Sequence, residues 1–352
     1  MRARRQTRLV RAGDVAIGGG SPVSVQTMAN ADPHDAKALC AQLASCAALG
    51  CDIFRMTVPD ARAAETLGEV RKASPIPIVA DIHFDYRCAL AALEAGADAL
   101  RINPGNIGGR DRVRAVAQAA KEHGATIRVG VNMGSLEKGL PRTPQGLCDS
   151  ALRHVAMLED EGFRDIVISA KASNVADTLE AYRLLAGATD CPLHLGVTEA
   201  GTLIPGTVRS SVALGALLAE GIGDTIRVSL TARPECEVRA GMEILRSLGM
   251  RPPGASVTSC PTCGRTTADV AAVAARIEEA LERRLAGLPR GSRLPRVAVM
   301  GCVVNGPGEA KDADVALCGA NGEFMVYVKG EPTGRVSEED AAGRVMEYVS
   351  RI

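Results

Sequence analysis

Apolar residues along the first 230 positions alternate between two spacings. Short runs rich in Val and Ile, typical of buried strands, recur eight times, at 22–28, 52–58, 76–83, 99–104, 126–132, 165–171, 193–198 and 225–231. Stretches with helical spacing lie between them, for example at 35–49, 85–94, 112–123, 145–161, 175–185, 207–220 and 235–248. Eight such repeats predict a (β/α)8 TIM barrel, although a doubly wound open sheet shows the same alternation.

The pattern changes after residue 250, where RPPG (251–254) is typical of a turn or linker. The remaining sequence predicts a helix over 266–285 with Thr267 as its N-cap, strands at 295–301 and 324–330, and a closing helix over 337–349. A chain of 352 residues usually forms more than one domain. We therefore expect a barrel over 1–250 and a smaller α/β domain over 251–352.

Composition narrows the class of protein. The 41 basic and 41 acidic residues cancel, so we expect no nucleic-acid partner and only a local anion site. No apolar run approaches the roughly 20 residues that cross a bilayer, so no membrane association is expected. Eleven cysteines form an odd number, and no apolar segment follows the basic N-terminus. Reduced thiols and a cytoplasmic location are therefore expected.

Cationic side chains lie late in, or at the end of, five of the eight predicted strands: Arg55, Arg101, Arg128, Lys171 and Arg227. Polar residues occupy further strand ends, namely Gln26, Asn30, Asp81, His83, Asn103, Asn132, Thr198, Glu199 and Ser229. Parallel strands of a barrel all end at one face, so these residues should gather at one mouth. Charges at strand ends also simply mark where strands reach water, but five together favour a site for a highly anionic small molecule.

Two strand ends carry candidate acid–base groups. Glu199 ends the seventh strand, where a carboxylate facing several arginines suits a proton donor or acceptor. Asp81 and His83 end the third strand together and suggest acid–base or hydrogen-bonding roles. The plainer interpretations are a solvent-exposed loop residue for Glu199 and a core histidine for His83.

The second region carries a cysteine pattern. Cys260 and Cys263 lie in SCPTCGRT, and Cys302 opens the Gly-rich loop GCVVNGPGE, with Glu309 seven positions later. Three soft thiolates suit an iron–sulfur cluster or zinc. Glu309 is a candidate fourth ligand for a cluster. Residues 251–352 contain no histidine, so a zinc site would take Cys318, in what reads as a turn, as its fourth ligand.

Seven segments together resemble one family, the 4-hydroxy-3-methylbut-2-enyl diphosphate synthases, which are iron–sulfur enzymes of the methylerythritol phosphate route to isoprenoids. The segments are VADIHFDYR, LRINPGNIG, GVNMGSLEKG, LHLGVTEAG, EGIGDTIRVSL, CPTCGR and GCVVNGPGEA. The resemblance extends from about Val23 to Glu309 and implies the bacterial two-domain form, a TIM barrel followed by a cluster domain.

The resemblance also implies a chemistry. The family reductively opens and dehydrates 2-C-methylerythritol 2,4-cyclodiphosphate, using electrons from flavodoxin or ferredoxin and a 4Fe-4S cluster. By motif, the cluster ligands are Cys260, Cys263, Cys302 and Glu309. The substrate contacts are Arg55, Arg101, Asn103, Arg128, Asn132, Lys171, Thr198, Arg227 and Ser229, and the catalytic candidates are Asp81, His83 and Glu199. A homodimer is implied as well, in which each cluster caps the barrel of the partner.

Two other functions fit the residues. One is a zinc-stabilised barrel enzyme, such as a transferase acting on a diphosphate without redox chemistry. The other is an iron–sulfur sensor whose barrel binds a phosphorylated ligand without converting it. Metal content separates zinc from iron, and turnover separates an enzyme from a sensor.

Overall fold

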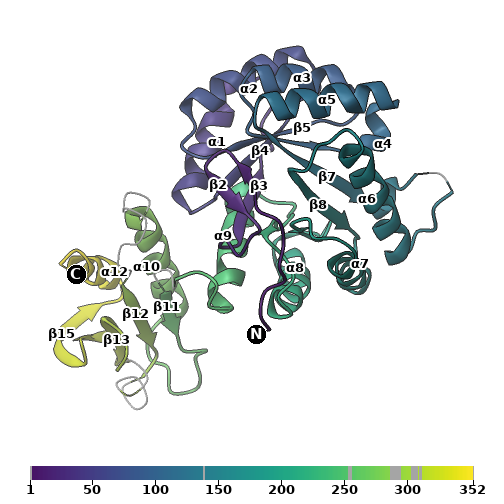
Figure 1. The fold of residues 1–352 in the computed structure, drawn as a ribbon. Helices are drawn as coiled ribbons and strands as arrows, with labels where there is room; N and C mark the ends of the chain where they lie inside the picture. The colour runs from purple at the N-terminus through teal and green to yellow at the C-terminus, as the bar shows by residue number, and fades with distance from the viewer. Residues whose placement is uncertain are drawn as a thin grey trace. The chain divides into compact units, whose positions relative to one another are not determined.

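The computed structural model describes residues 2–137, 139–252, 256–285, 295–302, 308 and 311–351. The chain forms two compact units, Met1–Arg251 and Pro252–Ile352 (Figure 1). Each has its own buried apolar core.

The first unit contains an eight-stranded parallel sheet that curls into a nearly closed barrel. Its strands are β3 (Ser24–Met28), β4 (Ile53–Thr57), β5 (Ile78–Asp81), β6 (Ala99–Ile102), β7 (Thr126–Asn132), β8 (Ile166–Lys171), β9 (His194–Leu195) and β10 (Thr225–Ile226). They pair in the order β8-β7-β6-β5-β4-β3-β10-β9, and a bridge between Ile168 and Leu193 joins the two ends. The predicted TIM barrel is confirmed. Strands β9 and β10 are shorter than predicted, so Thr198 and Ser229 lie in the loops beyond them.

Helices surround this barrel, as expected for crossovers between parallel strands (Figure 1). They are α1 (Ala36–Ala48), α2 (Ala61–Ala73), α3 (Tyr86–Glu94), α4 (Pro104–Ile107), α5 (Arg110–Glu122), α6 (Pro144–Glu159), α7 (Val175–Ala188), α8 (Leu203–Ala219) and α9 (Pro234–Ser247), with a 3₁₀ turn at Met133–Ser135. Several begin at side-chain caps, for example Asp35, Asp60 and Asn174, each accepting from a backbone N–H of the first turn. These caps end the strand-to-helix loops and so define the rim of the mouth.

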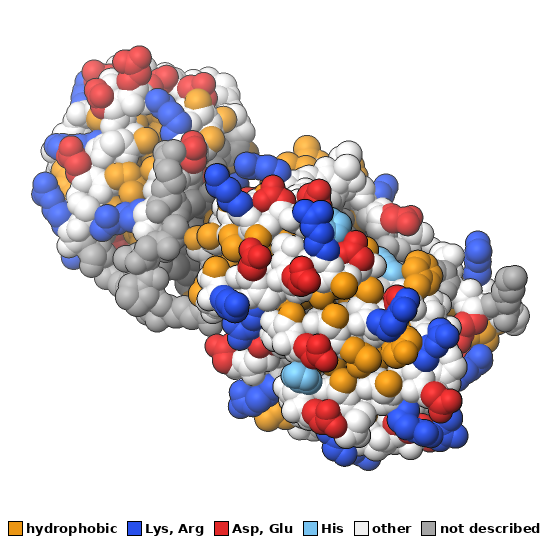
Figure 2. Space-filling model, turned by 90° about the horizontal axis from the view of Figure 1, so that it is seen from above, with side chains coloured by type: hydrophobic (Ala, Val, Ile, Leu, Met, Phe, Trp, Pro, Cys, Tyr) orange, Lys and Arg blue, Asp and Glu red, His pale blue; other side chains and the backbone are white. Residues whose placement is uncertain are grey.

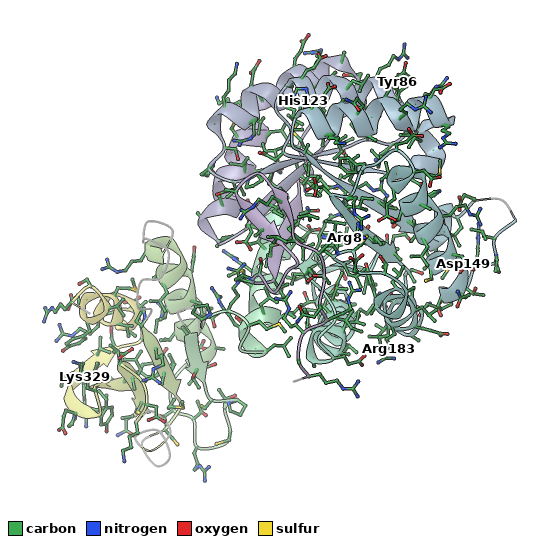
Figure 3. All side chains as sticks on the ribbon, in the orientation of Figure 1. Arg8, Tyr86, His123, Asp149, Arg183 and Lys329 are labelled. Atoms are coloured by element: carbon green, nitrogen blue, oxygen red, sulfur yellow. The ribbon has the colours of Figure 1, made fainter. Side chains whose placement is uncertain are left out.

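The N-terminal segment closes the opposite end of the barrel. Strands β1 (Val10–Ala12) and β2 (Val15–Ile17) form a hairpin, whose apolar residues pack against Ile53, Val79 and Val167 inside the barrel. Arg8, labelled in Figure 3, pairs with Glu159 at 2.9 Å and with Asp190. The periodicity of the sequence did not indicate this hairpin, because its strands have three residues each. It leaves the carboxyl ends of the strands as the open face.

The second unit is a mixed five-stranded sheet in the order β11-β12-β13-β14-β15. The strands are β11 (Ser256–Ser259), β12 (Arg296–Met300), β13 (Val315–Ala320), β14 (Glu323–Val328) and β15 (Glu331–Ser337). The first three are parallel and the last two antiparallel. Helices α10 (Val270–Leu285) and α12 (Ala341–Val349) share one apolar core with strands β12 to β14.

Three details of the second unit differ from the sequence predictions. The α10 helix is capped by Asp269, whose carboxylate accepts from the Ala272 N–H, and not by Thr267. Backbone groups of Thr267 instead bond to Gly301 and Gly322, which holds it against the strands. The last helix begins at Ala341 because β15 occupies residues up to Ser337. Cys318 lies inside β13 and is fully buried, so the predicted turn at this position was wrong.

The described surface is mixed in charge. Basic and acidic side chains are interspersed over the face seen in Figure 2, in keeping with the equal numbers of the two kinds. Among the described residues, no helix is both long enough and apolar enough to cross a membrane.

Candidate active site

Five cationic side chains converge inside the barrel. They are Arg55 in β4, Arg101 in β6, Arg128 in β7, Lys171 at the end of β8 and Arg227 directly after β10. Three of them, Arg55, Arg128 and Lys171, are at least 93% buried. The charges of Arg227, Arg128, Arg55 and Arg101 all act on the Lys171 amine. Residues spread over 173 positions of sequence therefore form one cluster, because parallel strands bring their ends to one face.

Asp81, the last residue of β5, is the anionic centre of this cluster. Its carboxylate accepts from Arg55 Nη2 at 2.7 Å and from Arg101 Nη1 at 3.4 Å. It also lies 3.1 Å from His83 Nε2. Burial opposes ionisation of Asp81, but the charges of Arg55 and Arg101 outweigh it and lower the pKa to about 2. Asp81 is therefore a permanent carboxylate at neutral pH.

A second carboxylate, Glu237 in the first turn of α9, holds Arg227. The guanidinium donates from Nε and Nη2 to the two carboxylate oxygens, each at 3.2 Å. Thr27 Oγ1 and the Leu230 N–H also donate to Glu237, at 2.8 and 3.0 Å. Sequence reasoning missed Glu237, because acidic residues in a first helical turn are ordinarily explained by the helix dipole.

The cluster has more positive than negative charge. Two carboxylates, Asp81 and Glu237, face five cationic side chains. Arg128 donates to Ser169 Oγ at 2.7 Å, yet its Nε and Nη2 are buried without a partner among the described residues. Buried donors without acceptors are uncommon in proteins and indicate a missing ligand or water. The arrangement is suited to a multiply charged anion.

Two glycines provide the space for these cations. A Cβ at Gly130 would lie 2.4 Å from Arg101 Nε, and a Cβ at Gly196 would lie 2.6 Å from Lys171 Nζ. The same Cβ at residue 196 would lie only 2.9 Å from the Arg227 carbonyl oxygen. The clash therefore involves the backbone as well as a flexible side chain. The absence of a side chain at Gly130 in β7 and at Gly196, directly after β9, is thus a requirement of the cation cluster.

A Gly196→Ala variant is expected to displace the Lys171 amine and to weaken binding of anions at the mouth at least tenfold, roughly the loss of one charge-assisted hydrogen bond. Titration calorimetry with inorganic diphosphate measures the affinity. The matched control is Gly187→Ala in α7, where a Cβ meets nothing within 4 Å and affinity should not change. Equal affinity in the two variants would show that Gly196 provides no needed space.

The remaining predicted strand-end residues lie on the barrel strands or in the loops that follow them. Asn103 is buried, and its Oδ1 caps α4 by accepting from the Gly105 N–H at 3.1 Å. Asn132 ends β7 directly beside Lys171 in the sheet register. Thr198 and Ser229 are half-buried in the loops after β9 and β10. Gln26 is buried in β3 and Asn30 is exposed beyond that strand.

Glu199 and His83 are two accessible titratable groups of the rim. Glu199 is exposed and has a left-handed backbone with φ of 52°, a conformation that is uncommon for residues other than glycine. His83 is exposed on one side and touches the Asp81 carboxylate on the other. Backbone strain of this kind concentrates at functional sites, which makes Glu199 a good candidate for contact with a ligand.

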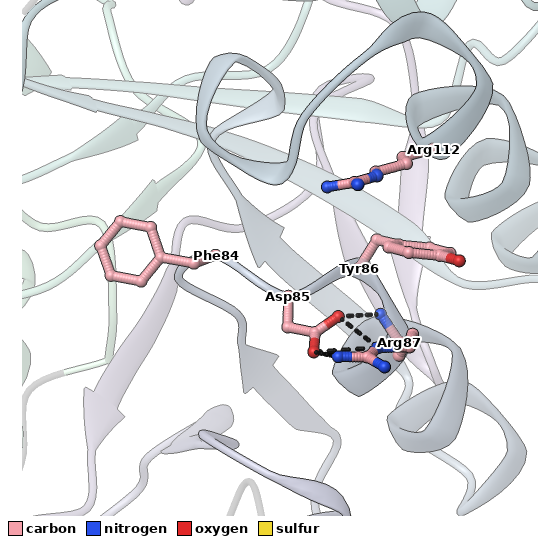
Figure 4. A pocket seen from close by; sticks show the side chains of 5 residues that line it. All are labelled: Phe84, Asp85, Tyr86, Arg87 and Arg112. Carbon is pink, nitrogen blue, oxygen red and sulfur yellow. Dashed lines mark hydrogen bonds and ion pairs between the residues drawn. The ribbon is translucent and has the colours of Figure 1, made fainter.

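A separate open hollow of about 440 Å³ lies beside the loop after β5 (Figure 4). Phe84, Asp85, Tyr86, Arg87 and Arg112 line it. Asp85 is paired with Arg87 at 2.7 Å, and Arg112 stacks over the Tyr86 ring at 5.6 Å. Its charged groups therefore already have partners, and we place the candidate site at the cation cluster instead.

In the second unit, the three predicted cysteine ligands follow the carboxyl ends of neighbouring parallel strands. Cys260 comes directly after β11 and Cys302 two residues after β12. The Gly301 N–H donates to Cys260 Sγ at 3.1 Å, and the Cys260 N–H donates to the Val299 carbonyl. Cys263 is exposed, with its N–H bonded to Thr266 Oγ1 at 3.0 Å.

The candidate ligand atoms in this region suit an iron–sulfur cluster. It offers three thiols at adjacent strand ends, a backbone N–H directed at one sulfur, and Gly301 where a Cβ would meet Thr266 at 2.8 Å. Glu309 lies outside the described residues. Within the described part of the chain, no three His, Cys, Asp or Glu side chains are arranged to hold a metal ion.

Two family models match the chain: the GcpE TIM-barrel domain over residues 7–242 and the GcpE protein C-terminal domain over residues 256–351. A Geobacter sulfurreducens protein named 4-hydroxy-3-methylbut-2-en-1-yl diphosphate synthase (flavodoxin) is 51% identical, covering 99% of this chain and 98% of its own length. A protein of the same name from Maridesulfovibrio salexigens is 52% identical, covering 96% of this chain and 94% of its own length.

Among solved structures, Xanthomonas albilineans dihydropteroate synthase has a TM-score of 0.52 at 15% identity, covering 69% of this chain and 97% of that one. That likeness concerns the barrel fold alone. The two family models leave only a short gap between them, and the relatives match from end to end. The chain belongs to the GcpE family.

Proposed function

We propose that this protein is a 4-hydroxy-3-methylbut-2-enyl diphosphate synthase, which converts 2-C-methylerythritol 2,4-cyclodiphosphate to the open allylic diphosphate. Relatives that match nearly the full length of the chain, with sequence identities of 51% and 52%, carry that name. One structural observation supports the substrate class most directly: five cations meet two carboxylates inside the barrel mouth. A substrate with two linked phosphates would supply the missing negative charge.

The reaction requires two electrons and one proton for each substrate. A ring C–O bond to phosphate breaks, the neighbouring hydroxyl leaves as water with the added proton, and a carbon–carbon double bond forms. The cyclic diphosphate, which has two negative charges, becomes an open diphosphate with three. The protein must therefore hold a growing negative charge, which the surplus of cations favours.

We assign the diphosphate to Arg55, Arg101, Arg128, Lys171 and Arg227. Asp81 and Glu237 keep Arg55, Arg101 and Arg227 in fixed orientations by their hydrogen bonds. Orientation matters because a guanidinium that is already positioned loses less entropy when it binds phosphate. Asn103, Asn132, Thr198 and Ser229 are proposed to bind the hydroxyl groups and the remaining phosphate oxygens.

Acid–base work is assigned by ionisation and exposure. Asp81 remains ionised, so it orients its neighbours and does not donate a proton. Glu199 on the rim is our proposed proton donor to the departing hydroxyl, because it is exposed and not tied to a described arginine. His83, bound to Asp81, is proposed to hold the substrate on the side of that carboxylate.

Cys260, Cys263, Cys302 and Glu309 are proposed to hold a 4Fe-4S cluster. When bound, such a cluster supplies single electrons and, at a corner held by a carboxylate, a Lewis-acidic iron. Reduced flavodoxin is the proposed electron donor, with ferredoxin as the alternative. The names of the relatives include flavodoxin. We further propose a homodimer and a cytoplasmic location. None of the eleven cysteines forms a disulfide bond.

Cys318 remains the alternative fourth ligand for a zinc site. It packs with Met300 and Ala316 in an apolar cluster that Cys260 also touches. Burial, followed by the neighbouring Cys302 and Cys260 thiols, raises its pKa to about 11. Because Cys318 is fully buried inside β13, whereas Cys260 and Cys302 follow strand ends, its position favours the cluster over a zinc site.

Anaerobic purification followed by turnover of the cyclodiphosphate with a chemical reductant tests this function. Brown protein with about four irons per chain and formation of the allylic diphosphate are expected. Colourless protein with one zinc would replace the proposal with the zinc enzyme. Brown protein that binds the substrate without converting it would replace it with the sensor.

Inorganic diphosphate is expected to raise the Tm of the barrel unit by several degrees, because a ligand at 100 times its Kd stabilises by about 2.7 kcal/mol. Thermal denaturation at matched ionic strength measures the shift. An Arg128→Gln variant, which removes the buried donors without partners, should show a clearly smaller shift. Equal shifts in both proteins would place diphosphate elsewhere.

A further inference from the structure

Lys171 differs from the other four cations in its hydrogen bonding. Arg55 and Arg101 donate to Asp81, Arg128 donates to Ser169, and Arg227 donates to Glu237. Within the described residues, no hydrogen bond or ion pair joins the Lys171 amine to an acceptor, and its Nζ is not among the side-chain atoms fully shielded from solvent. Its side chain is nevertheless buried, with a residue exposure of 6%.

The surroundings of this amine are almost entirely positive. Four guanidinium groups act on it from β4, β6, β7 and the loop after β10, with Arg227 the strongest and Arg128 next. The neighbouring His194 in β9 is fully buried, and burial followed by the charge of Arg128 keeps its pKa well below the ordinary value. Asp81 and Glu237 are engaged by arginines. The amine itself lies against Gly196.

Only one member of the cluster can relieve this repulsion by losing a proton. A guanidinium stays charged throughout the physiological pH range, whereas a buried ammonium gives up its proton readily. Burial first, and then the four arginine charges, lowers the pKa of Lys171 well below 10.5. A bound diphosphate would bring several negative charges to the same place and reverse the balance.

We propose that the Lys171 amine is uncharged in the ligand-free protein at neutral pH and takes up one proton when a diphosphate binds in the barrel mouth. The choice of diphosphate as the ligand rests on the proposed function. The uncharged state of the Lys171 amine without ligand rests only on the group of cationic side chains around it. Lys171 thereby limits the positive charge of the empty barrel and restores it when an anion is present. Anion binding and proton uptake become linked.

A direct test observes the amine itself. The chain has seven lysines, so labelling with ¹⁵N-lysine gives few side-chain signals, and the one missing in a Lys171→Arg variant belongs to Lys171. The ¹⁵N chemical shift distinguishes an amine from an ammonium. We expect an amine at about pH 7.5 without ligand and an ammonium after addition of inorganic diphosphate. An ammonium in the ligand-free protein overturns the proposal, and so does an amine that persists in the diphosphate complex.

Calorimetry provides the matched comparison. Protons taken up on binding inorganic diphosphate are counted from the heats in buffers of different ionisation enthalpy. Arginine keeps a positive charge without titrating, so Lys171→Arg reports the protonation of diphosphate alone. On binding diphosphate, wild type should take up as much as one proton more than this variant. As the pH is lowered from about 9, the affinity of wild type relative to the variant should rise by as much as tenfold per pH unit. Equal proton counts overturn the proposal.

Two outcomes separate this inference from the proposed function. If inorganic diphosphate does not bind to wild type, the assignment of a diphosphate site fails, while the ligand-free ¹⁵N shift still decides the state of the amine. If the Lys171→Arg side chain proves too large for the space beside Gly196, Lys171→Met replaces it as the variant that cannot titrate. Circular dichroism and thermal unfolding show whether each variant folds.

Discussion

A Cys302→Ala variant, purified anaerobically, is expected to be nearly colourless and to lose activity by more than ~100-fold. Loss of a residue that only supports a metal ligand lowers activity by about 10- to 100-fold, and loss of a ligand itself should lower it further. Two thiols from Cys260 and Cys263 cannot anchor a tetranuclear cluster, because thiolates are the ligands that hold its irons in place and only two would remain. Iron content, visible absorption and turnover of the cyclodiphosphate measure the effect. Thermal unfolding should still show a folded barrel, since Cys302 belongs to the second unit.

The matched control is Cys236→Ala, which removes a partly buried thiol from α9 of the barrel and should keep full iron and activity. A Glu309→Ala variant separates the ligands further, because three thiols remain. It should retain a cluster with altered absorption and lower activity. Full iron and full activity in Cys302→Ala would exclude Cys302 as a ligand and direct attention to Cys318.

Replacement of Asp81 by Asn is expected to lower the free energy of unfolding by about 3 kcal/mol at neutral pH, since breaking a buried ion pair leaves its partner charge uncompensated. The variant preserves the shape of the side chain but leaves Arg55 and Arg101 without their shared carboxylate. Urea denaturation measures the difference. Activity should fall as well, because the two guanidinium groups lose their orientation.

The pH dependence of this effect has a definite sign. The folded pKa of Asp81, about 2, lies below the ordinary value near 3.9 of an unfolded aspartate. Its contribution is therefore fully present above about pH 4 and is lost as the pH falls towards about 2, where wild type and Asp81→Asn should converge. Asp111→Asn, which removes an exposed partner of Arg114 at 3.6 Å, should stay within about 0.5 kcal/mol of wild type. A similarly small effect at Asp81 would contradict its central place in the cluster.

Much of the barrel could be predicted because its signal is local. Parallel strands covered by helices are buried on both faces and read as short apolar runs, and all eight runs became strands of one sheet. The hairpin β1–β2 and the strand β13 were missed, since a three-residue strand has no period and Cys318 beside Gly319 resembles a turn. Tertiary contacts with the barrel floor and with β12 and β14 stabilise these segments.

The site was predictable in its members but not in its pairings. Positions of Arg55, Arg101 and Arg128 within strands were enough to place them at one mouth. Nothing local indicated that Asp81 bridges two of the arginines or that Glu237 holds Arg227. These partners come from different strands and helices, so their distances depend on the register and curvature of the whole sheet.

The amino-acid sequence alone was sufficient to determine the number of strands, the strand ends that carry charge and the spacing of the cysteines. Each of these is a property of residues that are neighbours in the chain. The balance of charge inside the barrel required the folded chain. Burial and the convergence of eight strands decide which carboxylates reach which guanidinium groups, and they leave the Lys171 amine among four positive charges beside Gly196. Electrostatic energy depends on distance and on exclusion of water, and neither exists until the barrel closes.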